Sequence, residues 1–251
     1  MTMEGYIALQ FDDGHRNVKF EVFDRYPYKF TCMIVSGVIS TKFQRYLHDY
    51  IGAENKWYYW ATLFEHELQS MNASGRVDLQ NHSVVHHNCL FFNTVHMAED
   101  ELKREIFPCN DFIEGITGRK PIAFVAPFNA HDAWIEGKLD GYFKYWLDTM
   151  WDMNNWLSGL NDIPVPQHLK TIYLNDKRLI DYGWTYIDEL LTYLKTNKKL
   201  AILHMHGITW ENIAIKDVNF SPANFKVLAD KLKPMHDAGH LILFREIPEL
   251  T

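Results

Sequence analysis

The chain alternates between short apolar runs and longer segments in which apolar residues recur at helical spacing. The strand-like runs are 6–11, 30–35, 77–80, 122–126, 142–147, 171–174, 200–205 and 241–244. Helical spacing occurs at 98–115, 185–195 and 222–238, and Ser221 and Pro222 provide the cap and the first residue of the last of these. Because the two kinds of segment alternate, the pattern predicts parallel strands connected by crossover helices.

One domain accounts for the whole chain. Its 251 residues, 47% of them hydrophobic, contain no linker-like, low-complexity or repeated segment. An α/β barrel routinely reaches this length as a single unit. The segment 151–170, which holds Pro164 and Pro166, is expected to be a long loop. We therefore expect one domain over residues 1–251, built as a (β/α) barrel.

Composition limits the binding partners and the cell compartment that we expect for this chain. A net charge of −7 provides no basic field for a polyanion, so nucleic-acid binding is not expected. No apolar run is long enough to span a bilayer, so we expect no membrane insertion. Cys32, Cys89 and Cys109 are odd in number and form no C-x-x-C pair, which argues against a disulfide framework. With no signal-peptide pattern, the chain is expected in the cytoplasm.

Polar residues collect at the ends of the predicted strands. Asp12 and Asp13 follow the first run, His82 follows the third, Asp148 the fifth and His206 the seventh. In a (β/α) barrel, catalytic groups lie at the carboxyl ends of the strands. The pattern therefore predicts a site on one rim of the barrel.

His82 and His86 are four residues apart. On a helical turn this spacing places both imidazoles on one face, where they can bind one metal ion. The spacing alone is a weak signal, because solvated or capping histidines also show it. In zincins a glutamate general base follows the first histidine, but Ser83 stands there in this chain. A base must therefore come from elsewhere.

Asp12 and Asp13 can supply both a third ligand and that base. Adjacent side chains of a regular strand point to opposite faces, so both carboxylates reach one site only if the chain turns there. Gly14 provides the flexible backbone for such a turn. If the pair is considered without the histidines, the alternative interpretation is an ordinary acidic loop that caps the next helix. Together with the histidines, the pair predicts a hydrolase.

The two motifs resemble those of polysaccharide deacetylases with a NodB homology domain, carbohydrate esterase family 4. Residues 10–14, Gln-Phe-Asp-Asp-Gly, resemble the family's T-F-D-D-G motif, and residues 82–86, His-Ser-Val-Val-His, resemble H-[ST]-x-x-H. The flanking segments 29–35 and 77–81 are also similar, and the resemblance spans nearly the whole chain. It implies a distorted (β/α) barrel of seven to eight parallel strands.

The resemblance also implies roles for individual residues. Asp13, His82 and His86 would bind a divalent metal, usually zinc, and Asp12 would be the general base. A backbone amide near Phe128 would contact the oxyanion. Two histidines and one carboxylate also accept Co²⁺, Ni²⁺, Mn²⁺ or Fe²⁺, so the identity of the metal stays open.

The family's late L-x-H motif carries a histidine acid that protonates the leaving amine. His204 and His206 are both candidates, because residues two apart lie on the same face of a strand. We favour His206, which is closer to the rim and is followed by Gly207. His204 is the alternative.

Two motifs depart from the family pattern. Val125 occupies the place of the arginine in R-P-P-Y, and Asp148 begins only a loose match to D-x-x-D-W. The arginine that would orient the base is therefore missing, and the carboxylate that would tune the acid is unassigned. Among the aromatic residues, Trp151 and Trp156 are candidate sugar contacts because they lie in the expected loop.

These observations predict a metal-dependent hydrolase that removes N-acetyl groups from an amino sugar or glycan, with an N-acetylated saccharide as its partner. The missing arginine leaves two alternatives. One is hydrolysis of another C–N bond, such as an N-formyl group or a small cyclic amide. The other is an inactive carbohydrate-binding scaffold. The oligomeric state is not indicated by the sequence.

Overall fold

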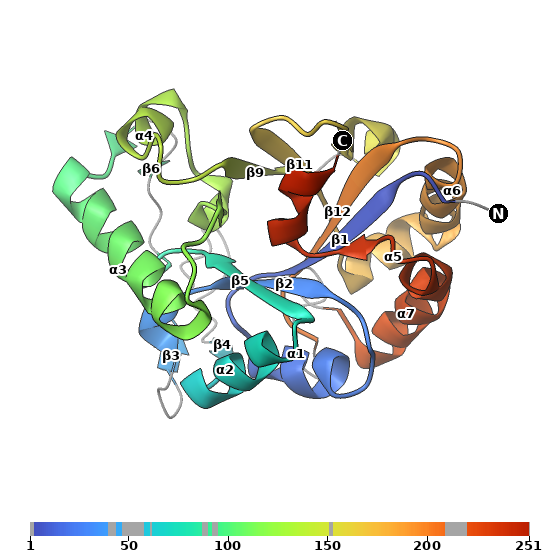
Figure 1. Ribbon diagram of the computed structural model, residues 1–251, viewed down its shortest axis with the longest axis horizontal. Helices are drawn as coiled ribbons and strands as arrows, with labels where there is room; N and C mark the ends of the chain where they lie inside the picture. The colour runs from blue at the N-terminus through green and yellow to red at the C-terminus, as the bar shows by residue number, and fades with distance from the viewer. Residues whose placement is uncertain are drawn as a thin grey trace.

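The computed structural model describes residues 3–39, 44–46, 58–60, 62–86, 90–91, 95–150, 153–208 and 220–250. Its centre is a closed barrel of parallel strands (Figure 1). The pairing order is β1-β2-β5-β8-β9-β11-β12, and β12 pairs again with β1. The bounds are β1 Tyr6–Phe11, β2 Phe30–Ile34, β5 Val77–Asn81, β8 Ala123–Phe124, β9 Tyr145–Met150, β11 His168–Tyr173 and β12 Lys199–Met205. The predicted distorted (β/α) barrel of seven to eight parallel strands is confirmed.

Two short strands extend the barrel at its amino-terminal end. The last predicted strand, 241–244, is reduced to β13 (Leu241–Ile242), which pairs with the first half of β1. The expected loop 151–170 is partly ordered: it contains a 3-10 helix (Met153–Gly159) and β10 (Leu160–Asp162), which runs antiparallel to the start of β12. The loop prediction was therefore wrong for this part of the segment and also for residues 168–170, which begin β11.

Strand β9 begins three residues later than its apolar run predicts. Tyr142 belongs to a turn, in which Gly141 has a positive φ of 77° and the Tyr142 amide donates to the Leu139 carbonyl. The turn is built on the end of α4 (Ala133–Lys138). The strand also ends later than predicted, at Met150, so Asp148 lies inside the strand rather than after it.

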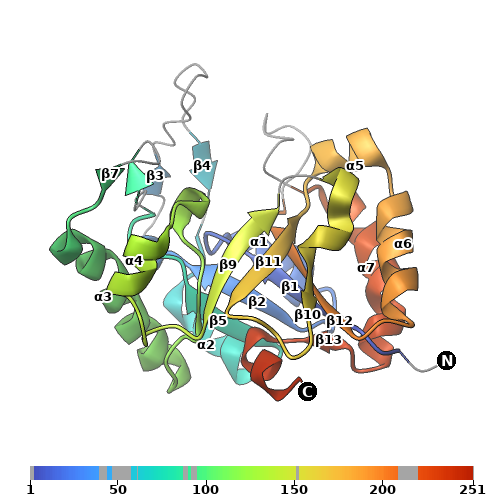
Figure 2. The same ribbon diagram turned by 90° about the horizontal axis from the view of Figure 1, so that it is seen from above.

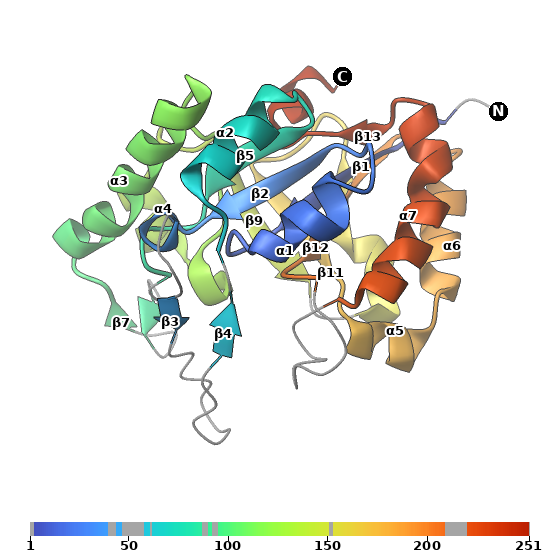
Figure 3. The same ribbon diagram turned by 90° about the horizontal axis from the view of Figure 1, so that it is seen from below.

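Helices surround the barrel, with α2 and α3 on one side and α6 and α7 on the opposite side (Figure 3). The three predicted helices are confirmed within two residues at each end. Ser221 caps α7 by accepting a hydrogen bond from the Asn224 amide, and Gly118, with φ of 69°, ends α3. The helix bounds are α1 Arg16–Val18, α2 Glu65–Ala73, α3 Glu99–Thr117, α5 Asp176–Tyr182, α6 Thr185–Leu194 and α7 Pro222–Asp237. The remaining strands are β3 Gln44–Tyr46, β4 Tyr58–Trp60, β6 Leu90–Phe91 and β7 Val95–His96.

The barrel strands lie side by side in the centre of the molecule (Figure 2). The interior that they enclose changes from apolar to polar along the strands. Ala8, Leu147 and Ile202 pack together near the amino-terminal end. Two residues further along β1 and β12, the inward positions are the polar Gln10 and His204, which are paired across the strands. Because side chains alternate between the two faces of a strand, this polar layer opens toward the carboxyl ends, where the predicted site residues lie.

Other expectations concern the membrane and the cysteines. Within the described residues, no helix combines the length and apolar character needed to cross a bilayer. Cys32 and Cys109 are buried free thiols, and burial raises the pKa of Cys109 to about 11. Cys89 lies outside the described residues.

Candidate active site

Asp12 and Asp13 lie on a turn that directly follows β1. The Asp12 amide donates a hydrogen bond to the Met205 carbonyl at the end of β12, and the chain leaves the sheet after this residue. Asp13 and Gly14 both have positive φ, 69° and 65°, and this left-handed turn brings the two adjacent carboxylates to one site. Both are buried. The turn expected at Gly14 is present.

The histidine segment is not a helical turn. Ser83 and His86 have positive φ of 73° and 60°, and residues 84–85 form a bend, so the predicted helical geometry is wrong. The imidazoles of His82 and His86 nevertheless converge, with ring centroids 4.8 Å apart. Side chains replace the helical hydrogen bonds: Ser83 Oγ accepts from the His86 amide at 2.9 Å.

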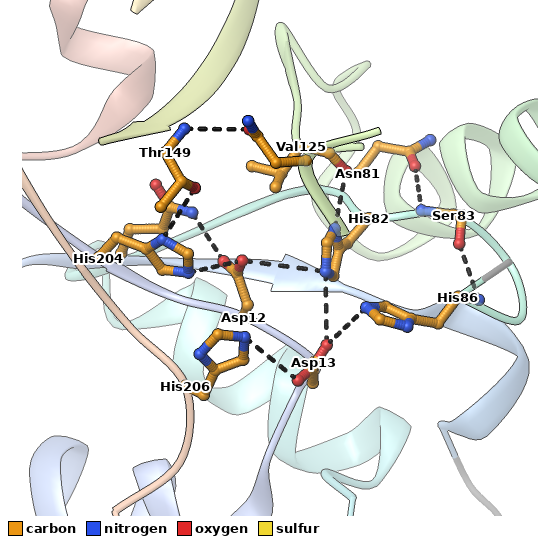
Figure 4. Close-up of polar contacts among 12 residues, drawn as sticks. Asp12, Asp13, Asn81, His82, Ser83, His86, Val125, Thr149, His204 and His206 are labelled. Carbon is orange, nitrogen blue, oxygen red and sulfur yellow. Dashed lines mark hydrogen bonds and ion pairs between the residues drawn. The ribbon is translucent and has the colours of Figure 1, made fainter. Parts of the chain in front are cut away.

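Asn81, which the sequence did not single out, anchors this segment (Figure 4). Its Oδ1 accepts from the Ser83 amide at 2.7 Å, and its Nδ2 donates to the Ile106 carbonyl at 2.9 Å and to Asn110 Oδ1 at 2.6 Å. Ile106 and Asn110 belong to α3. The helix therefore fixes the backbone that presents both histidines.

The group formed by Asp13, His82 and His86 fits a divalent metal. Asp13 Oδ1 lies 3.4 Å from both imidazole Nε2 atoms, and tetrahedral zinc with bonds of about 2.0–2.1 Å separates its ligand atoms by about 3.3 Å. Asp13 Oδ1 is buried and has no hydrogen-bond partner of good geometry among the described residues. His82 Nδ1 faces the Val125 carbonyl at 2.7 Å, which leaves Nε2 for the ion.

Asp12 is held by different partners. Gln10 Nε2 donates to Asp12 Oδ1 at 2.7 Å, and His204 Nε2 lies 2.8 Å from Asp12 Oδ2. His82 Nε2 is further from that oxygen, at 3.9 Å. Burial raises the pKa of Asp12, but the fields of His204 and His82 outweigh it and bring the pKa down to about 2. Asp12 is therefore an anionic carboxylate beside the ligand group.

The two candidate acids occupy different depths. His204 is buried, with Nδ1 3.4 Å from Thr149 Oγ1, whereas the side chain of His206 is 20% exposed and its Nε2 lies 3.9 Å from Asp13 Oδ2. The ring of Tyr173 packs against both imidazoles. Burial lowers the pKa of His206 to about 4.

His15 is a further imidazole that the sequence reasoning missed. Its Nε2 lies 3.5 Å from Asp13 Oδ2. The ring packs on Gly207, where an added Cβ would come within 3.1 Å of it. Its position directly after the Asp-Asp-Gly turn is the signal that could have revealed it.

The remaining predicted site residues lie at different distances from the group formed by Asp13, His82 and His86. Phe128 is next to it: its ring centroid is 4.9 Å from that of His86, the residue is 49% exposed, and its φ is 61°. Trp156 instead packs against Tyr193 of α6, on the outer flank of the barrel, so the structure does not bring it to the site. Trp151 lies outside the described residues.

Asp148 also lies away from the site. Its Oδ1 is 2.8 Å from His131 Nε2 and its Oδ2 is 3.4 Å from His168 Nδ1, on the outer face of β9. The next residue, Thr149, is the one that faces His204. The loose match to D-x-x-D-W therefore places no Asp148 carboxylate beside either candidate acid.

Comparisons with known proteins agree with this arrangement. A family model described as polysaccharide deacetylase matches residues 2–139. A search of curated proteins finds no match.

Solved structures with the same fold share little sequence with this chain. The Xyl-CE4 domain of a multidomain xylanase from the hindgut metagenome of Trinervitermes trinervoides has 16% identity and a TM-score of 0.57, with 98% of this chain and 90% of that chain covered. A family 4 acetyl xylan esterase from Clostridium thermocellum, in complex with a cobalt ion, has 16% identity, a TM-score of 0.55 and coverages of 96% and 89%.

A CE4 family pseudoenzyme from Bacillus anthracis has 11% identity, a TM-score of 0.50 and coverages of 98% of this chain and 66% of that one. Some similar chains are longer, and this chain spans 39% of a polysaccharide deacetylase from Bacillus cereus.

Proposed function

The chain belongs to the polysaccharide deacetylase family, and on that premise we propose that it is a metal-dependent hydrolase that removes N-acetyl groups from an amino sugar or glycan. The main support for the proposal is that two adjacent carboxylates have different partners. Asp13 shares its Oδ1 with His82 and His86, while Asp12 has its own partners and stays available as a base.

The metal is proposed to be held by Asp13, His82 and His86, and zinc is the first choice among Zn²⁺, Co²⁺, Ni²⁺, Mn²⁺ and Fe²⁺. When bound, such an ion supplies Lewis-acid activation of a water and of the acyl oxygen. The acetyl xylan esterase with a bound cobalt ion is a precedent for a divalent metal on this fold.

The chain's own residues move the protons. Asp12, ionised because its pKa is about 2, accepts the proton of the attacking water, and Gln10 keeps the carboxylate oriented through Oδ1. The backbone amide of Phe128 faces the acyl oxygen in this proposal. His206 delivers a proton to the leaving nitrogen. Because the pKa of His206 is about 4, its imidazole is neutral at rest at neutral pH. The proton that Asp12 takes from water is therefore passed to His206, which has a ring nitrogen within 4.8 Å of an Asp12 oxygen, and from His206 to the leaving nitrogen.

An acetylated saccharide is the proposed substrate. The side chain of Phe128 supports this choice, because an exposed ring beside the ligand His86 offers an apolar face on which a pyranose can stack. Trp156, which packs against Tyr193 of α6, is not proposed as a sugar contact.

The test is acetate release by the protein reconstituted with Zn²⁺ or Co²⁺, measured on N-acetylchitooligosaccharides, acetylated xylan and formylated amino sugars. Asp12→Asn should keep the ion, because Asp12 is not a proposed ligand, and should lose about 10²–10⁴-fold in kcat. Release of formate alone would favour the other C–N bond, and glycan binding without turnover would favour the inactive scaffold. Acetate release that survives both Asp12→Asn and metal removal would refute the proposal.

A further inference from the structure

His204 lies deeper in the barrel than a substrate-facing group. It is paired with Gln10 across β1 and β12, one residue before the last residue of β12. Its side chain is 5% exposed, compared with 20% for His206. Thr149 and Tyr173 enclose the ring on the other sides. Part of the His206 side chain is therefore exposed to an approaching leaving group, whereas the ring of His204 is covered.

His204 and Gln10 contact the two oxygens of Asp12 separately. Gln10 Nε2 donates to Oδ1 at 2.7 Å, and His204 Nε2 lies 2.8 Å from Oδ2. Together these contacts leave the carboxylate little freedom to rotate about its χ2 bond. A base that is fixed in this way is already oriented for the water it deprotonates.

In the part of the chain that the structure describes, no arginine or lysine forms an ion pair with Asp12. Its ion pairs and hydrogen bonds there are with Gln10, His82 and His204. Val125 presents an apolar, buried side chain, and its carbonyl is taken up by His82 Nδ1. The partner of Asp12 therefore comes from β12 instead of from the segment that follows β8.

We propose that His204 is a positioning residue that orients Asp12 through Nε2, in the role left vacant at Val125, and that His206 alone reaches the leaving group. The inference rests on the proposed function and gives the two histidines different roles. His204 orients the base Asp12 and is not the acid, and His206 protonates the leaving group.

A leaving-group comparison tests this division. The leaving group of 4-nitrophenyl acetate departs without help from an acid, whereas the amine of an N-acetylchitooligosaccharide needs a proton. Loss of base positioning slows both reactions, but loss of the acid slows only the second. Gln and Asn form a matched pair at position 204. The amide nitrogen of Gln can take the place of Nε2 and face Asp12, whereas that of Asn takes the place of Nδ1 and faces Thr149.

We expect His204→Asn to lower kcat on both substrates by about 10- to 100-fold with little change in KM. His204→Gln should recover most of the loss. His206→Gln should slow only the amide substrate. Thr171→Val, which changes a buried interior side chain that has no hydrogen-bond partner among the described residues, should leave both rates and the metal content unchanged.

Three results would overturn the inference. The first is wild-type rates in His204→Asn, and the second is a loss in His204→Asn that is confined to the amide substrate, which would make His204 the acid. The third concerns Asp12, His204 and His206, whose ligand atoms also come within 4.8 Å of one another. Two bound ions in the wild-type protein and one in His204→Asn would make this group a second metal site. A wild-type protein inactive on both substrates would instead overturn the proposed function, and this inference with it.

Discussion

Replacing Asn81 with alanine should weaken both the fold and the metal site. The Asn81 side chain is fully buried and makes three hydrogen bonds, to the Ser83 amide, the Ile106 carbonyl and Asn110 Oδ1. Each partner left unsatisfied in the interior costs about 1 kcal/mol or more, so we expect a loss of about 3 kcal/mol in the free energy of unfolding. Because the same bonds fix the backbone between His82 and His86, metal affinity should fall about 10- to 100-fold.

Asn161 provides a matched control at the opposite end of the barrel. Its side chain is also buried and makes three hydrogen bonds, with the Lys170 amide, the Lys170 carbonyl and the Leu200 carbonyl. Urea unfolding of the metal-free proteins should show similar losses for Asn81→Ala and Asn161→Ala. Competition with a chromogenic zinc chelator should show weakened binding only for Asn81→Ala. Equal zinc affinities in the two variants would refute the idea that Asn81 organises the ligand segment.

Further predictions concern the proposed metal ligand Asp13, the charged pair of His131 and Asp148, and the close contact between Gly207 and His15. Asp13→Ala should reduce bound zinc to near zero, as measured by elemental analysis after desalting, because it removes the shared carboxylate. Despite burial, the carboxylates of Asp148 and Glu136 raise the pKa of His131, and His131 in turn lowers the pKa of Asp148 despite the partial burial of that carboxylate. Their mutual stabilisation, about 1–2 kcal/mol, is therefore complete between the unfolded-state pKa values of the two groups. It is lost as pH rises through the folded pKa of His131, so unfolding curves of wild type and Asp148→Asn should converge there and differ near pH 5–6. Gly207→Ala should lower the melting temperature and cost about 1 kcal/mol or more, because the new methyl group would press on His15.

The fold followed from periodicity, but the bounds of individual strands did not. Alternating strand-like and helix-like runs predict the barrel because only a few topologies bury both kinds of apolar face. The run 142–147 was misplaced because Tyr142 is as apolar as a strand residue, while the left-handed Gly141 holds it in a turn. Apolar character alone does not distinguish an exposed turn residue from the first residue of a strand.

The histidine segment shows a second limit of spacing arguments. Residues four apart meet on a helix, and His82 and His86 do meet, but through two left-handed residues held by side-chain hydrogen bonds. The partners of Asn81 lie on α3, 25 and 29 residues away. Contacts of that range depend on how a helix packs on a strand, so no local pattern could have revealed them.

Strand parity explains which of the remaining candidates reached the site. Side chains alternate along β9, so Thr149 points inward to His204 while Asp148 points outward to His131. A loose motif match does not determine on which face of the strand a residue lies, because an alignment error of one residue exchanges the two faces. Parity also placed His204 and His206 on one face, but it could not rank them by depth. The pairing of Gln10 with His204 ranks them, because it puts His204 at the level below Asp12 and leaves His206 beyond the end of the strand.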